Sequence, residues 1–364
     1  MKSMGRIIFL VVCAVLFQRS SYAGSSCPSV DRVYPCFCTS DNQRTLLICT
    51  GIRNSTHLEQ VTKSFKSMIV DRLVMLNTFS KIEDEELDDM NEIEVIPTPD
   101  PDSKEYKQMN IFPKKWLSAL RVRELEIQGG NLHNCFLCNE ALEGQAEFLT
   151  SLIAKNAGLS GHVCSTCSLG SNPSSLSTRE FKKTPLVETV DLSYNAIDVI
   201  DGAAFPSTMK ELKTIILSNN QLTRINDNAF SNLHQLTALD LSRNQLTSFS
   251  RKIFRSDDRS LRSLDLSYNA ILSLPSDMFD RIQVLREVKL SYNLITTLPN
   301  TTWTKMPVLT ERIDLRGNFL VCNCSMKWLR TNINKSTKIL AQCLLPKAVE
   351  FQDLKPNLAS LQSC

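Results

Sequence analysis

A repeat of 24 or 25 residues constrains this chain more than any other feature of its sequence. Six segments share one eleven-position template, with apolar residues at positions 4, 6 and 11 and asparagine at position 9: 187–197, 212–222, 236–246, 261–271, 285–295 and 310–320. The asparagines are Asn195, Asn220, Asn244, Asn269, Asn293 and Asn318. Ten residues after each of the first five stands an aromatic residue: Phe205, Phe230, Phe254, Phe279 and Trp303. This regularity makes the repeat the unit of the fold.

Positions 4 and 6 of the template predict a short strand with one apolar side, because side chains alternate along a strand. One such strand per repeat, stacked in parallel, buries that side against its neighbours alone. An asparagine side chain carries donors and acceptors, so a stacked row of asparagines is expected to satisfy the backbone groups where the chain leaves each strand. The aromatic row is expected to fill the far wall of the core.

The pattern resembles that of extracellular leucine-rich repeat proteins, LxxLxLxxNxL with a phenylalanine further on. The resemblance implies an α/β solenoid, a leucine-rich repeat horseshoe with a parallel concave sheet and disulfide-capped ends. Looser matches stand at 70–79, 91–96, 120–132 and 149–159. The predicted domains are six regular repeats over 186–320, degenerate repeats over 61–132, and an irregular repeat with a four-cysteine insertion over 133–185.

The first 23 residues are interpreted as a secretory signal peptide. Lys2 and Arg6 precede an uninterrupted apolar run over 7–17, and residues 21–23 end in the small residues that signal peptidase requires. The run is too short to cross about 30 Å of hydrocarbon as a helix, and no other apolar stretch reaches that length. We therefore expect a secreted, extracellular protein with no membrane span. Asn323 is set aside as a glycosylation site because cysteines flank it, and the expected sites are Asn54, Asn300 and Asn334.

The charge balance and the motifs exclude several classes of function. Lys and Arg number 41 against 38 Asp and Glu, and removal of Lys2, Arg6 and Arg19 with the signal leaves 38 against 38. A chain without net charge has no general attraction to nucleic acid or to an anionic membrane. No HExxH or G-x-S-x-G motif is present, so the sequence indicates no enzyme, cofactor or metal site. The acidic run over 83–89 lacks the spacing of a calcium loop and is interpreted as a solvated surface.

Twelve of the thirteen cysteines lie outside the signal, in three groups of four, as expected for disulfides formed in an oxidising compartment. The first group falls in a predicted N-terminal cap over 24–60, and the last falls in a predicted C-terminal cap over 321–364. The resemblance to capped extracellular repeat proteins implies the pairs Cys27–Cys38, Cys36–Cys49, Cys322–Cys343 and Cys324–Cys364.

The central cysteines, Cys135, Cys138, Cys164 and Cys167, allow two interpretations. Two Cys-x-x-Cys pairs about 25 residues apart are close to the spacing of a four-cysteine zinc site. The signal peptide and the even number of cysteines favour instead two disulfides formed among these four.

Side chains at template positions 2, 3, 5, 7 and 8 are expected to line the concave face, which solenoids of this kind use for binding. Position 5 is aspartate in four of the six repeats, and these aspartates are interpreted as scaffold residues in preference to binding residues. Tyrosine and arginine carry much of the binding energy at protein interfaces. The candidate partner-binding residues are therefore Tyr194, Arg243, Arg262, Tyr268, Arg286, Lys289 and Tyr292.

The sequence thus predicts a secreted, non-enzymatic protein that binds a protein partner through its concave face. The segment over 30–49 (VDRVYPCFCTSDNQRTLLIC) also resembles arthropod secreted repeat proteins, which include the non-catalytic subunit of the deep-sea shrimp luciferase. That resemblance implies an accessory role that stabilises a secreted luciferase-type monooxygenase. The alternative is a recognition protein of innate immunity or cell adhesion that binds a microbial or cell-surface ligand.

Overall fold

A computed structural model of the chain provides the coordinates. It describes residues 27–28, 34–41, 44–52, 55–64, 68–78, 115–130, 142–159, 181, 183–202, 204–322, 326, 336–345 and 349–351. Several predicted features lie outside these residues: the signal peptide over 1–23, the acidic run over 83–89, the looser match at 91–96, the four central cysteines, the pair Cys324–Cys364, and the glycosylation sites Asn54 and Asn334.

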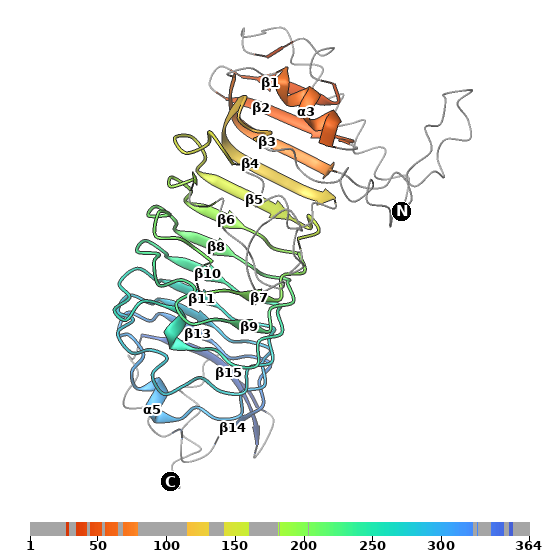
Figure 1. Cartoon of the computed structure of the whole chain (residues 1–364). Coiled ribbons are helices and arrows are strands. Elements are labelled where there is room, and N and C mark those ends of the chain that lie inside the picture. Colours follow the sequence, from red (N-terminus) through yellow and green to blue (C-terminus); the bar gives the residue numbers. More distant parts are fainter. Residues whose placement is uncertain are drawn as a thin grey trace, which may run out of the picture.

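One continuous sheet runs along the described chain, with one strand per repeat (Figure 1). Its strands, in the order in which they pair, are β1 (Cys36–Ser40), β2 (Thr45–Thr50), β3 (Met68–Thr78), β4 (Leu120–Gly130), β5 (Ser151–Lys155), β6 (Thr189–Asp191), β8 (Thr214–Ile216), β10 (Ala238–Asp240), β11 (Ser263–Asp265), β12 (Glu287–Lys289), β13 (Arg312–Asp314), β15 (Lys338–Leu345) and β14 (Leu320–Val321). The pairs from β2 to β15 are parallel, whereas β1 pairs antiparallel with β2 and β16 (Val349–Phe351) pairs antiparallel with β15. The order confirms a parallel solenoid of the horseshoe type.

The two halves of the sheet differ in width. Strands β3 and β4 are 11 residues long and pair from Met68–Leu120 to Thr78–Gly130. In the regular repeats, the strands of this sheet from β6 to β13 have only 3 residues each, which are template positions 3 to 5. The looser matches at 70–79, 120–132 and 149–159 correspond to β3, β4 and β5, which join the same sheet in chain order.

The strands of the regular repeats end after three residues because the backbone turns at the same point in each coil. Side chains at positions 4 and 6, such as Leu264 and Leu266, are buried in the core. The residue at position 8 then has a positive φ, 56° at Tyr268, which carries the chain out of the strand direction. Strand register follows the repeat, so Leu239 lies beside Leu264 on the next strand.

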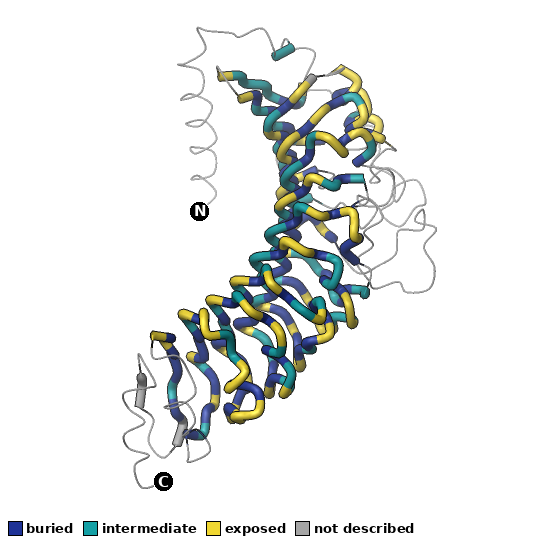
Figure 2. The backbone as a smooth tube through the Cα atoms, turned by 90° about the vertical axis from the view of Figure 1, so that its left-hand side faces the viewer, coloured by how far each residue is buried: buried dark blue, intermediate teal, exposed yellow. Residues whose placement is uncertain are grey.

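A row of aromatic rings fills the core opposite the sheet, as predicted. Phe205, Phe230, Phe254, Phe279 and Trp303 are all buried. The ring centroids of Phe205 and Phe230 are 5.5 Å apart, and those of Phe230 and Phe254 are 6.2 Å apart. Phe181 extends the row by one coil, 5.8 Å from Phe205, after the looser match at 149–159 that forms β5. Figure 2 shows the buried residues inside the stack and the exposed ones on its outer surface.

The asparagines form a ladder that joins successive coils. The Oδ1 atom of Asn220 accepts from the backbone N–H of Ile197 in the preceding coil (3.1 Å). Its Nδ2 donates to Leu192 O of the preceding coil (2.9 Å) and to Leu217 O of its own coil (3.1 Å). Asn195, Asn244, Asn269, Asn293 and Asn318 make the equivalent bonds. Each asparagine therefore satisfies buried backbone groups of two coils at once.

Disulfides and short secondary elements close the ends. Cys27–Cys38 and Cys36–Cys49 join the first strands, and Cys322–Cys343 joins the end of the regular repeats to β15. These are three of the four pairs that the resemblance implies. Helix α3 (Ser55–Lys63) follows β2 and buries Leu58 and Val61 in the first coil of the core.

The stretches that return from one strand to the next contain little regular structure. They include β7 (Val199–Ile200) paired with β9 (Arg224–Ile225), a 3-10 helix at Arg251–Ile253, and the short helix α5 (Asn300–Trp303). The expected glycosylation site Asn300 is exposed at the start of α5, on a return stretch and away from the sheet. A glycan at Asn300 would therefore leave the concave face open.

Candidate partner-binding surface

The aspartates at position 5 hold the turn that follows each strand. The Oδ1 atoms of Asp191, Asp240, Asp265 and Asp314 each accept the backbone N–H of the residue two positions on, at 2.9–3.2 Å. A carboxylate that caps a local N–H in this way is a turn-forming group. The geometry supports the interpretation of these aspartates as scaffold.

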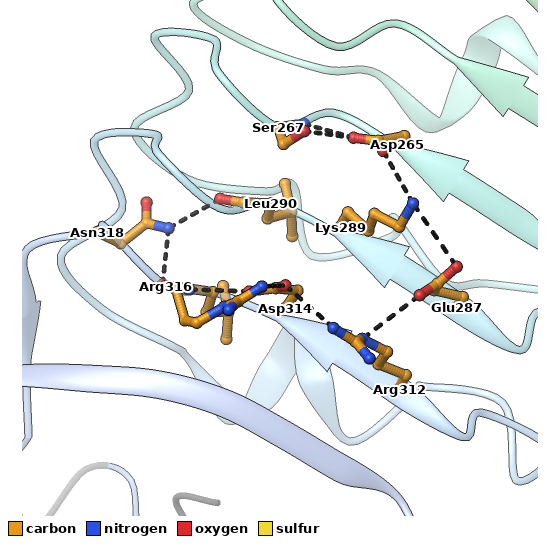
Figure 3. A network of polar contacts seen from close by, with 10 residues as sticks. Asp265, Ser267, Glu287, Lys289, Leu290, Arg312, Asp314, Arg316 and Asn318 are labelled. Carbon is orange, nitrogen blue, oxygen red and sulfur yellow. Dashed lines mark hydrogen bonds and ion pairs between the residues drawn. The ribbon is translucent and has the colours of Figure 1, made fainter. Parts of the chain in front are cut away.

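Charged side chains form a ladder across the concave face of β11, β12 and β13 (Figure 3). Lys289 Nζ lies 3.2 Å from Asp265 and 3.8 Å from Glu287, and Arg312 bridges Glu287 (3.4 Å) and Asp314 (3.6 Å). Arg316 completes the ladder with a bidentate contact to Asp314, at 2.6 and 2.9 Å. Lys289, a predicted binding residue, is thus already engaged by carboxylates of its own sheet.

The ladder shifts the pKa values of its members. Burial by itself lowers the pKa of Lys289, but the attraction of Asp265 and Glu287 outweighs it and the pKa is raised. Burial by itself raises the pKa of Asp314, but hydrogen bonds from Arg316 and the charges of Arg316 and Arg312 outweigh it and the pKa is lowered. Both shifts favour the charged forms.

Replacing Asp314 with asparagine is expected to remove a pH-dependent part of the stability. Because the folded-state pKa lies below the unfolded value of about 3.9, the contribution is complete near pH 7 and is lost as the pH falls through the folded-state pKa. Asp314→Asn should lower the free energy of unfolding by about 1–3 kcal/mol at pH 7 and by less at pH 3. Urea unfolding at both pH values measures this. The control is Asp227→Asn, at an exposed site; an equal loss at both pH values would contradict the prediction.

A column of stacked side chains lies at the other end of the same strands. The Arg243 guanidinium carbon is 4.0 Å from the centroid of the Tyr268 ring, and the rings of Tyr268 and Tyr292 are stacked with centroids 4.4 Å apart. The Tyr292 ring in turn covers Gly317, where a Cβ atom would lie 2.6 Å from Cδ1 of Tyr292. Arg243, Tyr268, Tyr292 and Gly317, here called the tyrosine column, occupy position 8 of four successive repeats.

A large side chain at position 8 carries a conformational cost, because the residue there has a positive φ. In the long sheet, every strand from β3 to β13 has a residue with positive φ at or just after its end, and the sequence supplies asparagine or glycine there at Asn77, Gly129, Asn156, Asn219 and Gly317. These are the residue types that adopt this conformation most readily. At Tyr194, Arg243, Tyr268 and Tyr292 the chain instead places bulky side chains at φ values of 55–60°. Each such residue costs of order 1 kcal/mol or more, and strain of this kind concentrates at functional sites.

At Tyr194, packing against a neighbouring ring does not explain why the chain accepts this strain. Its side chain is 59% exposed and makes no ring contact with another described residue. Stacking can offset the strain at Tyr268 and Tyr292 by about 0.5–1.5 kcal/mol, but it offers nothing at Tyr194.

The predicted binding residues lie in three places, because Lys289 belongs to the charged ladder and the others form two groups. Arg243, Tyr268 and Tyr292 belong to the tyrosine column, with Tyr194 in the same row two coils away. Arg262 and Arg286 stand at position 2, directly before β11 and β12, and so lie at the opposite ends of the strands. Arg286 is paired with Glu311, whereas Arg262 makes no ion pair with a described residue. The strands thus separate the arginines at position 2 from the arginine and tyrosines at position 8.

An exposed apolar flank adjoins the column and was missed in the sequence. It consists of Leu272, Leu294 and Phe319, which are 61%, 41% and 48% exposed. Leu294 and Phe319 occupy position 10 of the last two repeats, where earlier repeats have alanine or glutamine. The change to a large apolar residue at position 10 is therefore visible in the sequence. It was missed because position 10 is not among those expected to line the concave face.

The described residues show neither a metal site nor a membrane-crossing helix. They contain no group of three or more His, Cys, Asp or Glu side chains placed to hold a metal ion. Among them, no helix is both long and apolar enough to cross a membrane.

Comparison with known proteins identifies the repeat. The family model described as Leucine rich repeat matches residues 185–246 and 259–320. Leucine-rich repeat-containing protein 3 of Danio rerio is 38% identical over 77 residues, 21% of this chain and 29% of that protein. Toll-like receptor 10 of Bos taurus is 36% identical over 92 residues, 25% of this chain and 11% of that protein. The chain thus spans less than a third of the length of either relative.

A solved structure supports the fold over a longer stretch. A chain in the octameric complex of Latrophilin 3, Unc5D and FLRT2, whose FLRT2 part is a leucine-rich repeat, aligns with a TM-score of 0.53 and 17% identity. The alignment covers 88% of this chain and 94% of that one. At this identity the likeness shows the fold alone. The chain therefore has the fold of a leucine-rich repeat solenoid; its residues 185–246 and 259–320 match the family model, and disulfides close its N-terminal cap.

Proposed function

We propose that the chain is a secreted, non-enzymatic recognition protein that binds a protein partner along its concave face. The observation that carries the proposal is the row of large side chains at position 8, where Tyr194, Arg243, Tyr268 and Tyr292 accept backbone strain that asparagine or glycine would avoid. Tyrosine and arginine are also the residue types that dominate binding energy at interfaces. The disulfides support an extracellular location, because they persist in oxidising compartments.

The double variant Tyr268→Asn and Tyr292→Asn tests the proposal. Asparagine is the residue that the chain itself uses at this position in Asn219, so the turn is retained and the free energy of unfolding should change by less than about 1.5 kcal/mol. Binding to the partner captured by cross-linking from the native secretion should weaken at least about tenfold. Surface plasmon resonance measures the affinity.

The matched control removes two exposed apolar side chains elsewhere. Leu186→Asn and Leu309→Asn change residues that are 40% and 50% exposed, in the turns ahead of β6 and β13. This control should bind as the wild type does. If the double variant Tyr268→Asn and Tyr292→Asn also binds with unchanged affinity, the concave face with the tyrosine column is not the binding surface.

The nature of the partner divides the proposal into two finer forms. The accessory subunit of a secreted luciferase-type monooxygenase is supported by the resemblance of segment 30–49. Recognition in innate immunity or cell adhesion is supported by the segment shared with Toll-like receptor 10. Native mass spectrometry of the secretion distinguishes them, because only the accessory role requires a small secreted enzyme in a stoichiometric complex with this chain.

A further inference from the structure

The edge of the sheet that carries the tyrosine column has an unusual charge pattern. Template positions 7 to 11 contain no aspartate or glutamate in any of the six regular repeats, over 193–197, 218–222, 242–246, 267–271, 291–295 and 316–320. The cations at these positions are Arg243 and Arg316. Acidic side chains of the concave face stand at positions 2, 3 and 5, where they cap turns or pair with lysine and arginine.

Arg243 is the cation at this edge that is available to a ligand. Arg316 is held by Asp314 through two hydrogen bonds. Arg243 makes no hydrogen bond or ion pair through its side chain with any described residue, and its guanidinium carbon lies over the Tyr268 ring. A guanidinium stacked on a ring keeps its N–H donors in its own plane, where they fit the two oxygens of a carboxylate.

The apolar flank lies on the coils that follow the one with this cation, with Leu294 two coils and Phe319 three coils beyond it. The backbone N–H of Phe319 donates to Ile295 O (3.1 Å), and that of Leu294 donates to Ile271 O (3.0 Å), so position 10 of one coil lies next to position 11 of the coil before. Leu294 lies two residues after Tyr292 in the same coil, and Phe319 occupies the same template position as Leu294 in the next coil. Tyr292 is itself 53% exposed. Exposed apolar side chains on successive coils of one edge offer apolar surface that a partner can cover.

We propose that the tyrosine column and the apolar flank bind an extended acidic and apolar segment of the protein partner. A carboxylate of the segment pairs with Arg243, and apolar side chains further along it cover Tyr292, Leu294 and Phe319. This inference rests on the proposed function and names the chemistry of the partner. A nucleic acid or a sulfated glycan fits less well, because such polyanions are held by several basic groups and this edge offers a single unpaired guanidinium among the described residues.

A peptide library tests the inference without requiring that the partner be identified. Random 12-residue peptides displayed on phage are selected on the full chain, and the most enriched sequence is synthesised with a fluorescent label. The selected peptides should be enriched in aspartate or glutamate together with leucine or phenylalanine. Fluorescence anisotropy should show at least tenfold weaker binding of that peptide to Arg243→Gln and to the double variant Leu294→Asn and Phe319→Asn.

Arg224→Gln is the control, because Arg224 is also exposed and without an ion pair to a described residue but lies on β9, in a return stretch outside the long sheet. Its affinity for the peptide should stay within twofold of wild type, and thermal unfolding should show that all variants are folded. Selection without acidic enrichment, or binding that Arg224→Gln weakens and Arg243→Gln does not, overturns the inference. So does tighter, Arg243-dependent binding of a heparin tetrasaccharide or a thymidine 12-mer than of the peptide.

Failure of this inference is distinguishable from failure of the proposed function. The cross-linked partner is assayed separately with the Tyr268→Asn and Tyr292→Asn variant. Weaker binding of that partner, together with no acidic selection, leaves the concave-face proposal in place and removes only the assigned chemistry.

Discussion

Phe230→Ala is expected to lower the free energy of unfolding by about 3–5 kcal/mol. The Phe230 side chain is 1% exposed and lies between the rings of Phe205 and Phe254. Its removal leaves a cavity between two coils, and neither coil can close the cavity without shifting its strand out of the sheet. Because a coil contacts mainly its neighbours, amide hydrogen exchange should accelerate most near β8 and β10 and least near β3.

Phe319→Ala is the control, since the Phe319 side chain is 48% exposed. It should change the free energy of unfolding by less than about 1 kcal/mol. Urea unfolding of both variants and the wild type measures the difference. If Phe230→Ala and Phe319→Ala lower the free energy of unfolding by similar amounts, the aromatic row does not fill the core opposite the sheet.

Asn220→Ala is expected to lower the free energy of unfolding by about 2–4 kcal/mol, because it leaves the buried backbone N–H of Ile197 without an acceptor. The carbonyls of Leu192 and Leu217 keep one amide partner each, from Asn195 and Asn244. The loss therefore comes mainly from one buried donor, together with the weakened link between two coils.

Asn219→Gly is the matched control in the same coil. Asn219 has φ 55° and its side chain donates no hydrogen bond to a described residue, so glycine keeps the turn and removes nothing buried. It should leave the free energy of unfolding within about 1 kcal/mol of wild type. Equal losses at residues 219 and 220, measured by urea unfolding, would show that the ladder does not hold the coils together.

The regular half of the fold could be predicted because one sequence period fixes one coil. The positions of Leu264, Leu266 and Asn269 determine the strand, its buried side and the turn that ends it. The wide strands β3 and β4 could not be predicted in the same way. Their pairing extends over 11 residues, and its length depends on the neighbouring strand and not on a local template.

The sequence suggested candidate residues for the surface, but it revealed neither their arrangement nor the apolar flank. Lys289 was expected to be free for a partner, yet Asp265 is its neighbour on the adjacent strand. These two residues are 24 positions apart, so the repeat length itself indicates that they meet. The stacking of Arg243, Tyr268 and Tyr292 depends in addition on the positive φ at position 8, which decides where each side chain points.

The positive φ at position 8 also has a consequence for how such a molecule can change its specificity. Asparagine, glycine, tyrosine and arginine all occupy this position within one chain. The strand before it and the asparagine at position 9 after it stay the same. A single substitution at position 8 can therefore change the side chain at this edge of the sheet while the coil that carries it is retained. A position whose side chain does not stack, such as Tyr194, can be changed alone, whereas a change at Tyr268 or Tyr292 also alters the contact with the neighbouring coil.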